Sequence, residues 1–236
     1  MRQQVAKAIV LSRTNYGESD RILSLLTSDK GKIRLVAKGV RKSKSKNAGG
    51  IELLSINTIS YLQGSRDLGT LISARSEEQY DNIVKDIERT MFAYDLLKKI
   101  HIVTEDAVEE AYFSMLEQAL KGLDDLDLPL AAVKLWAYLQ LLLLMGHTPN
   151  LSQDTNGKRL RSEQTMYLFN FDHMAFSVDQ NGTFNAAAIK LLRLVTQQRS
   201  PLRLRQIRDV NEYWEPLAAF ASNLLMAQLP QKRSKT

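Results

Sequence analysis

The sequence predicts a multidomain α+β protein, in which an N-terminal β-barrel is followed by an all-α helical domain. Apolar residues alternate or cluster in short runs up to about residue 76, and beyond it they recur at helical spacing. Charge divides the chain in a similar way. Residues 1–46 hold twelve Lys and Arg against three Asp and Glu, a net charge of +9, whereas the remaining 190 residues carry −3. The basicity is therefore local, as expected of a binding surface for a polyanion.

Five short strands are expected before residue 77, each rich in Val, Ile and Leu, and five strands fit a small barrel. Their expected ranges are about 5–13, 20–27, 32–38, 55–63 and 68–76. Turns separate them at Asn15-Tyr16-Gly17, Ser28-Asp29-Lys30-Gly31 and 63–67. The longest connection, from Gly39 to about Leu53, carries a basic run, and connections of this length are usually functional or disordered.

Helices are expected in the rest of the chain. The first, about 78–102, would present one apolar face made of Ile83, Ile87, Met91, Tyr94, Leu97 and Ile100. A second spans about 105–122 with Thr104 as its N-cap, and a third runs from Leu128-Pro129 to Gly146. Residues 147–185 are irregular, with short strands fitting 166–171 and 175–178, and helices return at 186–198 and 212–228. The predicted domains are 1–77 and 78–229, followed by a basic tail at 230–236.

Composition argues against most enzymatic chemistry. The chain has no cysteine, which excludes disulfides, thiolate zinc sites and cysteine nucleophiles and fits a reducing cytoplasm. The three histidines are dispersed, and no phosphate-binding glycine loop is complete. No signal peptide is visible, and the most apolar segment, 135–145, is too short to span a membrane. We therefore expect no catalytic residues, no metal, no cofactor, no enzyme activity and no membrane association.

The basic run Gly39-Val40-Arg41-Lys42-Ser43-Lys44-Ser45-Lys46 is the main candidate for function, because cations beside small residues can follow a phosphate backbone. Five-stranded barrels of the OB type bind single strands by combining such a basic groove with stacking aromatic residues. Tyr16 could stack on a base or pack locally, and Tyr61 is a weaker candidate for stacking. The candidate nucleic-acid-binding residues are Tyr16, Lys32, Arg34, Lys38, Arg41, Lys42, Lys44 and Lys46.

A second basic set lies toward the C-terminus, where residues 190–208 include no acid. Its members are Lys190, Arg193, Arg199, Arg203, Arg205 and Arg208. Three interpretations remain open: an ordinary exposed helix and loop, a surface that contacts duplex DNA, and a seat for an acidic peptide. The run Lys158-Arg159-Leu160-Arg161 is a similar but weaker case.

A signature in the first 45 residues resembles that of the RecO family of bacterial recombination mediators. It consists of Tyr16-Gly17-Glu18-Ser19-Asp20, then Thr27 and Gly31, then Ala37-Lys38-Gly39-Val40-Arg41-Lys42-Ser43-Lys44-Ser45. The resemblance continues more loosely after Ser76, through 145–151 and through 168–172. It implies an N-terminal OB-fold, a C-terminal helical domain and a bacterial cytoplasmic protein.

The resemblance also implies an activity. RecO proteins bind single- and double-stranded DNA, anneal complementary strands, and work with RecR and with single-stranded-DNA-binding protein to load the RecA recombinase. DNA contacts of the family carry over to Lys38, Arg41 and Lys42, and to Lys44, while the acidic C-terminal tail of single-stranded-DNA-binding protein is one expected ligand of the 190–208 set. Many members bind zinc through four cysteines, and this chain has Asp154 and Gly157 where the first pair would fall. The zinc module is therefore expected to be absent or replaced by packing.

Two other functions compete with this interpretation. An OB-fold RNA-binding or regulatory protein would prefer RNA or particular bases. A hydrolase acting on nucleic acid would cleave strands in the presence of a metal ion. A mediator is instead expected to tolerate any sequence and to anneal strands.

Overall fold

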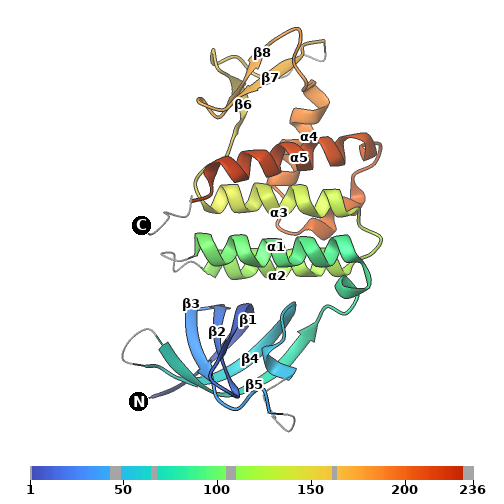
Figure 1. Cartoon of the computed structure of the whole chain (residues 1–236). Helices are drawn as coiled ribbons and strands as arrows, with labels where there is room; N and C mark the ends of the chain where they lie inside the picture. The colour runs from blue at the N-terminus through green and yellow to red at the C-terminus, as the bar shows by residue number, and fades with distance from the viewer. Residues whose placement is uncertain (1, 43–48, 65–67, 105–109, 161–163, 231–236) are drawn as a thin grey trace. The chain divides into compact units, whose positions relative to one another are not determined.

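A computed structural model of the protein describes residues 2–42, 49–64, 68–104, 110–160 and 164–230 (Figure 1). The described residues form two compact units, one from the N-terminus to Asp125 and the other comprising Leu126–Leu229. Five N-terminal strands are followed by a mainly helical region that also contains three short strands, so the α+β prediction is confirmed. The domain boundary near residue 78 stays a prediction, because one compact unit can contain more than one domain.

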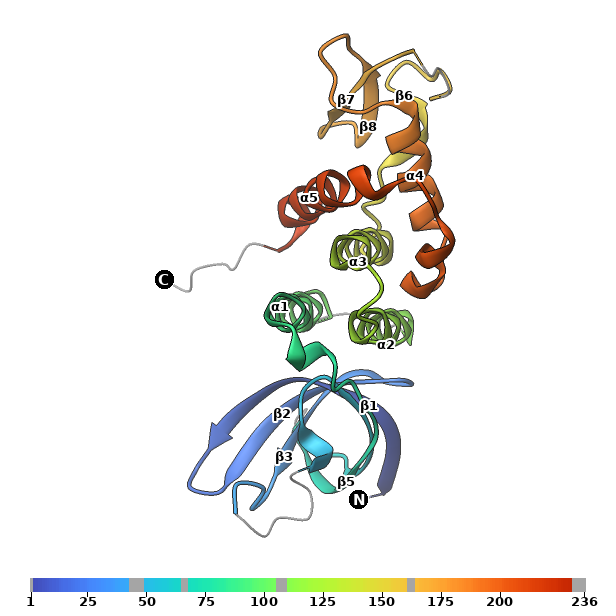
Figure 2. The same cartoon turned by 90° about the vertical axis from the view of Figure 1, so that its right-hand side faces the viewer.

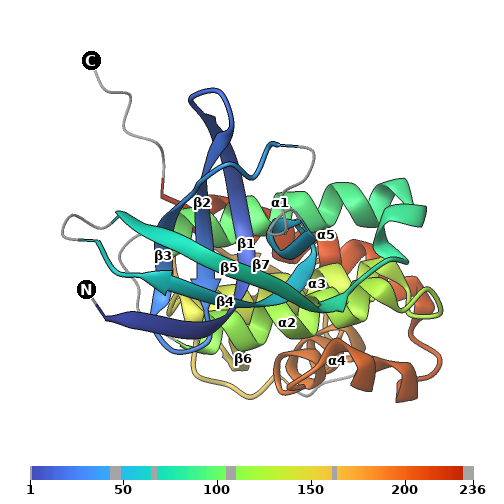
Figure 3. The same ribbon diagram turned by 90° about the horizontal axis from the view of Figure 1, so that it is seen from below.

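The N-terminal strands close into a barrel with the order β1-β2-β3-β5-β4 (Figure 3). Their bounds are β1 Gln3–Tyr16, β2 Asp20–Thr27, β3 Gly31–Ala37, β4 Ser55–Leu62 and β5 Leu68–Gln79. All neighbours are antiparallel except β3 and β5, which pair in parallel with Arg34 opposite Leu68. This is the topology of an OB-fold, so all five predicted strands and the predicted fold are confirmed.

Alternation along each strand decides which side chains fill the barrel. Ala8 and Val10 on β1, Leu23 and Leu25 on β2, and Leu35 on β3 are buried in one core cluster. Tyr61 belongs to the same cluster and is 0% exposed, so its ring packs inside the barrel and is not available for stacking on a base. A bulge between Val10 and Ser12 shifts the register of β1 against β2.

A short 3-10 helix, η1 (Gly49–Ile51), covers part of the barrel core. Ile51 is buried in the core cluster, and Gly50 lies directly against β5. A Cβ atom on Gly50 would stand 2.4 Å from the carbonyl carbon of Ala74, whereas one on Gly49 would meet nothing within 4 Å. The glycine pair in this long connection therefore has one position at which only glycine fits.

The first long helix begins later than the sequence predicts. Strand β5 continues to Gln79, a 3-10 turn η2 covers Ile83–Lys85, and α1 spans Ile87–Val103 with Asp86 as its N-cap. The predicted start at 78 is wrong because residues 77–79 extend the ladder with β4, where Ser55 pairs with Gln79.

The predicted apolar face of this helix is also wrong in part. Ile87 and Met91 are 72% and 65% exposed, and Tyr94 is exposed too. The buried positions include Phe92, Ala93, Leu96, Leu97 and Ile100. Arg89 is buried, and its guanidinium donates hydrogen bonds of 3.0 Å to the carbonyls of Leu123 and Asp125. Ile87, two residues earlier, lies on the opposite side of the helix and is exposed.

The second helix, α2, spans Glu110–Asp124. Thr104 is the C-cap of α1, and its hydroxyl donates to the carbonyl of Ile100. Residues 105–109 lie outside the described residues, so the role of Thr104 as N-cap of the second helix stays a prediction. Helix α1 packs against β1, and α2 packs against β2 and β3, so both helices cover one side of the barrel within the first unit.

The second unit is built around α3 (Leu130–Leu144), which is apolar on nearly every face and packs on α5 (Asn211–Gln228) and α4 (Ala186–Thr196) (Figure 2). A three-stranded sheet follows α3 in the chain, with the order β6-β8-β7. Its strands are β6 Asn150–Asp154, β7 Tyr167–Asn170 and β8 Ala175–Val178. The two expected short strands are confirmed, whereas β6 was not predicted. A 3-10 helix, η3 (Pro201–Gln206), links α4 to α5.

A cluster of phenylalanines fixes this sheet to the helices. Phe169 and Phe184 each contact Phe220 of α5 edge to face, at 4.9 Å between ring centroids. Phe176 packs edge to face on both Phe169 and Phe184. No helix among the described residues is long and apolar enough to cross a membrane.

Candidate nucleic-acid interface

Basic side chains follow the outer face of β3. Since the neighbouring odd-numbered residue Leu35 points into the barrel core, Lys32 and Arg34 project from the opposite face of the strand. Lys38 continues the same alternation one residue beyond the end of β3, and both Arg34 and Lys38 are exposed. We call Lys32, Arg34 and Lys38 the β3 basic row.

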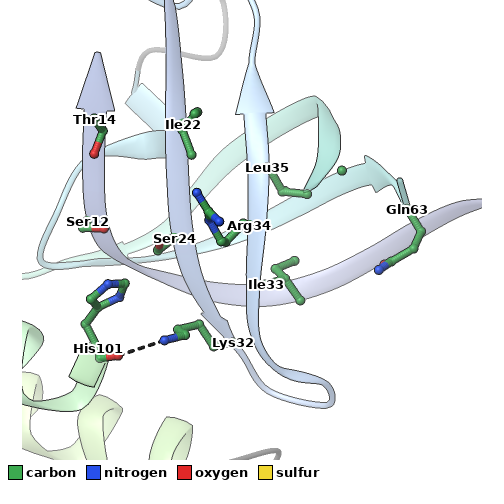
Figure 4. A pocket seen from close by; sticks show the side chains of 11 residues that line it. Ser12, Thr14, Ile22, Ser24, Lys32, Ile33, Arg34, Leu35, Gln63 and His101 are labelled. Atoms are coloured by element: carbon green, nitrogen blue, oxygen red, sulfur yellow. Dashed lines mark hydrogen bonds between the residues drawn. The ribbon is translucent and has the colours of Figure 1, made fainter. Parts of the chain in front are cut away.

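A hollow of about 670 Å³ lies along this face of the barrel (Figure 4). It is lined by Ser12, Thr14, Ile22, Ser24, Lys32, Ile33, Arg34, Leu35, Gln63, Gly69 and His101. Figure 4 shows Ser12, Ser24 and Arg34 on three neighbouring strands, in agreement with the register that pairs Ser12 with Ser24 and Ser24 with Arg34. The Lys32 ammonium donates a 2.9 Å hydrogen bond to the carbonyl of His101 at the end of α1.

This hollow is chemically suited to a polyanion. Hydroxyl groups from Ser12, Thr14 and Ser24 accompany the two cations, and neither Asp nor Glu is among the residues that line it. Hydroxyls and cationic groups are the donors that proteins commonly direct at phosphate and sugar. In OB-folds, this face of strands 2 and 3 is the one that binds oligonucleotides.

At one end of the β3 basic row, two turns that are distant in sequence are held together. The backbone N–H of Gly39 donates to Asp20 Oδ1 at 2.8 Å, and the N–H of Arg41 donates to the carbonyl of Ser19 at 3.0 Å. The Arg41 guanidinium also donates to the carbonyl of Gly17 at 3.2 Å. Both glycines have positive φ, 59° at Gly17 and 66° at Gly39, which favours glycine at each position. We call this arrangement the joined turns.

The joined turns present cations and one aromatic ring to solvent. Lys38, Arg41 and Lys42 are exposed, and Tyr16 is 55% exposed at the end of β1, where it pairs with Asp20. Exposure of Tyr16 leaves its ring accessible, so stacking on a base stays a prediction. Lys44 and Lys46 lie outside the described residues.

The second basic set lies on α4, on η3 and on the segments beside them in the second unit. Arg193 lines a hollow with Arg159, Ser152 and Gln153. Arg205 lines a different hollow with Asp127 and Trp214, and its guanidinium is 3.7 Å from the Asp127 carboxylate. Lys190, Arg199, Arg203 and Arg208 are exposed. The expectation of a single basic surface over 190–208 remains untested, and Arg193 and Arg205 line separate hollows.

A hydrogen-bonded turn occupies the place where the first cysteine pair would fall. Asp154 is 5% exposed, and its carboxylate accepts hydrogen bonds from the N–H groups of Asn156 at 2.9 Å and Lys158 at 2.8 Å. Gly157 supplies the positive φ, 78°, that closes the turn. Within the described ranges, no group of three or more His, Asp or Glu side chains could hold a metal ion. The turn is thus ordered by a carboxylate and backbone amides.

Sequence comparison places these features in a known family. A family model described as "Recombination protein O N terminal" matches residues 1–80, which contain the whole barrel. The DNA repair protein RecO of Dehalococcoides mccartyi (strain CBDB1) is 34% identical over 163 residues, covering 68% of this chain and 64% of the relative. That of Roseiflexus sp. (strain RS-1) is 30% identical over 210 residues, covering 84% of this chain and 72% of the relative. The chain belongs to the RecO family.

The match with the first relatives is incomplete, since it spans 64% of the length of both D. mccartyi proteins that are 33–34% identical. The RecO N-terminal match includes both joined turns and the β3 basic row. The resemblance seen in the first 45 residues is therefore confirmed as family membership, whereas the DNA-contacting roles of individual residues remain predictions.

Sequence reasoning missed some residues of this face. Ser12 was not identified, although a polar residue at the end of an apolar run such as 8–11 indicates an outward position. Ser24 also lines the hollow, but it is only 6% exposed. Asp20 was recognised only as part of the signature, and its bond to Gly39 depends on two turns meeting in space. His101, at the far end of α1, had no local signal that could place it beside Lys32.

Proposed function

We propose that this RecO-family chain is a non-enzymatic DNA repair and recombination mediator that binds DNA on the outer face of its barrel. The observation that carries the proposal is the joining of the 16–20 and 38–42 turns, which places exposed cations at the end of the β3 basic row. The binding face then runs from Lys32 along Arg34 to Lys38, Arg41 and Lys42.

Binding on this face is governed by the phosphate backbone. Each phosphate that a Lys or Arg neutralises releases condensed counterions, and this gain does not depend on base sequence. Hydroxyls of Ser12 and Thr14 add donors for phosphate and sugar, and the Tyr16 ring is available for stacking. The face therefore suits single strands of any sequence, and also the backbone of a duplex.

Strand annealing follows from the same physics. Two single strands repel each other through their phosphates, and a cationic surface that neutralises both lowers the electrostatic cost of bringing complementary bases together. No covalent step is involved. We further propose, on family membership, that the chain acts in the bacterial cytoplasm with RecR and single-stranded-DNA-binding protein to load RecA.

The principal test replaces Lys38, Arg41 and Lys42 together with alanine. At about 0.1 M salt, each phosphate contact on a single strand contributes roughly 0.7 decades of affinity, so three lost contacts lower affinity about 100-fold. The slope of log affinity against log salt should become shallower by about 2. Annealing of complementary oligonucleotides should slow in parallel.

A charge-matched control replaces Arg75, Lys85 and Lys98, which are exposed cations of the same unit that do not line the hollow. This control should retain most of the affinity. If both triple variants bind alike, net charge alone explains binding and the assigned face is incorrect.

The competing functions give different results in the same experiments. An RNA-binding protein would prefer an RNA of identical sequence, and a nuclease would shorten labelled DNA when Mg²⁺ or Mn²⁺ is added. A mediator should show neither effect, and it should anneal strands that are coated with single-stranded-DNA-binding protein.

A further inference from the structure

A small polar hollow in the second unit brings together two basic segments that are about thirty residues apart in the chain. Its volume is about 380 Å³, and Ser152, Gln153, Arg159 and Arg193 line it. Ser152 and Gln153 belong to β6, Arg159 follows β6, and Arg193 belongs to α4. We call it the Arg159/Arg193 hollow.

The Arg193 side chain is fixed at the wall of this hollow. It is partly buried, and its guanidinium donates to the carbonyl of Leu151 through Nε, at 3.2 Å, and through Nη2. A guanidinium carries five N–H groups, so these two bonds hold its orientation and leave further donors for an anion.

The loop that carries Arg159 is folded back onto β6. Arg159 forms an antiparallel bridge with Gln153, and the N–H of Leu160 donates to the carbonyl of Ser152 at 3.2 Å. The N–H of Asp154 donates to the carbonyl of Lys158 at 2.7 Å. These bonds set the backbone of Arg159 opposite β6, and the exposed Arg159 side chain reaches the hollow.

The surrounding charge is positive. Lys158 precedes Arg159 and is exposed, and Lys190 lies one helical turn before Arg193 on α4 and is also exposed. Asp154 is the acid nearest in sequence, but its buried carboxylate already accepts two turn amides. Two arginines and the polar groups of Ser152 and Gln153 therefore face the hollow with no acid among its lining residues.

We propose that the Arg159/Arg193 hollow binds a backbone phosphate of a second DNA strand. The proposal rests on the proposed function for the identity of the anion, and it adds a second contact outside the barrel. An arginine pair with hydroxyl and amide neighbours suits a tetrahedral oxyanion, because forked N–H donors match its oxygens. The lining residues carry no purely apolar side chain, which favours a phosphate over an acidic peptide anchored by hydrophobic residues.

The test combines this site with the barrel variant and uses a short oligothymidylate as the probe. Arg159→Gln/Arg193→Gln should remove the binding that remains after replacement of Lys38, Arg41 and Lys42. At about 0.1 M salt, loss of two contacts corresponds to roughly 25-fold weaker binding of the second strand. The matched control Arg199→Gln/Arg208→Gln removes two exposed arginines that do not line the hollow, and it should change second-strand binding little.

The two proposals fail in distinguishable ways. If the variant with Lys38, Arg41 and Lys42 replaced binds oligothymidylate like the unaltered chain, the proposed function fails. The hollow is then tested by the oligothymidylate affinity of the unaltered chain carrying only Arg159→Gln/Arg193→Gln. If those two replacements change oligothymidylate binding in neither background, the hollow is not a phosphate site. Tight binding of an acidic peptide that oligothymidylate does not displace would also overturn it.

Two further measurements guard against misfolding. Arg193→Lys keeps a cation but loses the forked bond to Leu151, so its effect combines a lost phosphate contact with a lost structural bond. Arg159→Gln alone breaks no described side-chain bond, and it should still weaken second-strand binding about fivefold. Photo-cross-linking of a 4-thiothymidine oligonucleotide to the unaltered chain should label peptides containing residues 152–160 or 190–193. Labels confined to the barrel would refute the proposal.

Discussion

Replacement of Asp20 separates positioning of the joined turns from simple electrostatics. Asp20 contributes a negative charge to a surface proposed to bind DNA, so removal of the charge alone should strengthen binding. Its carboxylate also accepts the N–H of Gly39 at 2.8 Å and so holds the loop that carries Lys38 and Arg41. Asp20→Asn removes the charge but keeps an oxygen acceptor, whereas Asp20→Ala removes both.

The structure sets the expected magnitudes. A hydrogen bond to a charged group contributes about 1.5–3 kcal/mol, and since Asp20 is only partly buried we expect about 1 kcal/mol. For a chain of this size, that loss lowers Tm by about 2–4 °C. If release of the loop costs one or two phosphate contacts, Asp20→Ala should weaken single-strand binding roughly 5- to 25-fold at about 0.1 M salt.

Fluorescence anisotropy with an oligothymidylate, measured over a series of salt concentrations, gives both the affinity and its salt slope. Asp20→Ala should bind more weakly than the unaltered chain, with a slope that is shallower by about 0.7–1.4. Asp20→Asn should bind at least as tightly as the unaltered chain. Equal or tighter binding by Asp20→Ala would show that the bond to Gly39 does not position the basic residues.

Three predictions concern stability. Gly50→Ala should lower the unfolding free energy by about 1–3 kcal/mol because the added Cβ collides with Ala74, while Gly49→Ala, measured in the same urea titration, should change it by less than about 0.5 kcal/mol. Asp154→Ala should cost about 2 kcal/mol by freeing two turn amides, and Asp154→Asn should cost less; equal losses in thermal melts would contradict the role of its acceptor oxygen. Burial, assisted by nearby carboxylates, raises the pKa of the Tyr80 phenol. Its contribution to stability is therefore complete below about pH 10 and declines as the pH rises further, and Tyr80→Phe should lack this decline in denaturant titrations at alkaline pH.

Local patterns predicted the barrel strands well because the apolar residues that become buried lie within each strand's own short run of sequence. Runs rich in Val, Ile and Leu predicted strands at 20–27 and 32–38, and the structure has β2 at Asp20–Thr27 and β3 at Gly31–Ala37. The same reasoning failed at α1. Residues 77–79 carry no strong strand signal, and their pairing with β4 is a long-range contact that moves the helix start to Ile87.

Long-range contacts also explain the other differences. Strand β6 is mostly polar, and it forms because β8 pairs beside it and the Asp154 turn orders its end. Arg89 could not be recognised as buried, since its partners, the carbonyls of Leu123 and Asp125, lie more than thirty residues away.

The sequence by itself determined the class of fold, the location of the positive charge and the resemblance to RecO, because these depend on composition and on neighbouring residues. Only the tertiary structure decided that the turn at 16–20 holds Gly39 and Arg41, and that Arg159 and Arg193 share one hollow. These contacts between distant segments depend on strand register and on packing. Short-range patterns of polarity in the sequence encode neither. The positions of the basic residues were therefore known from the sequence, whereas the surfaces that they form together depend on the tertiary structure.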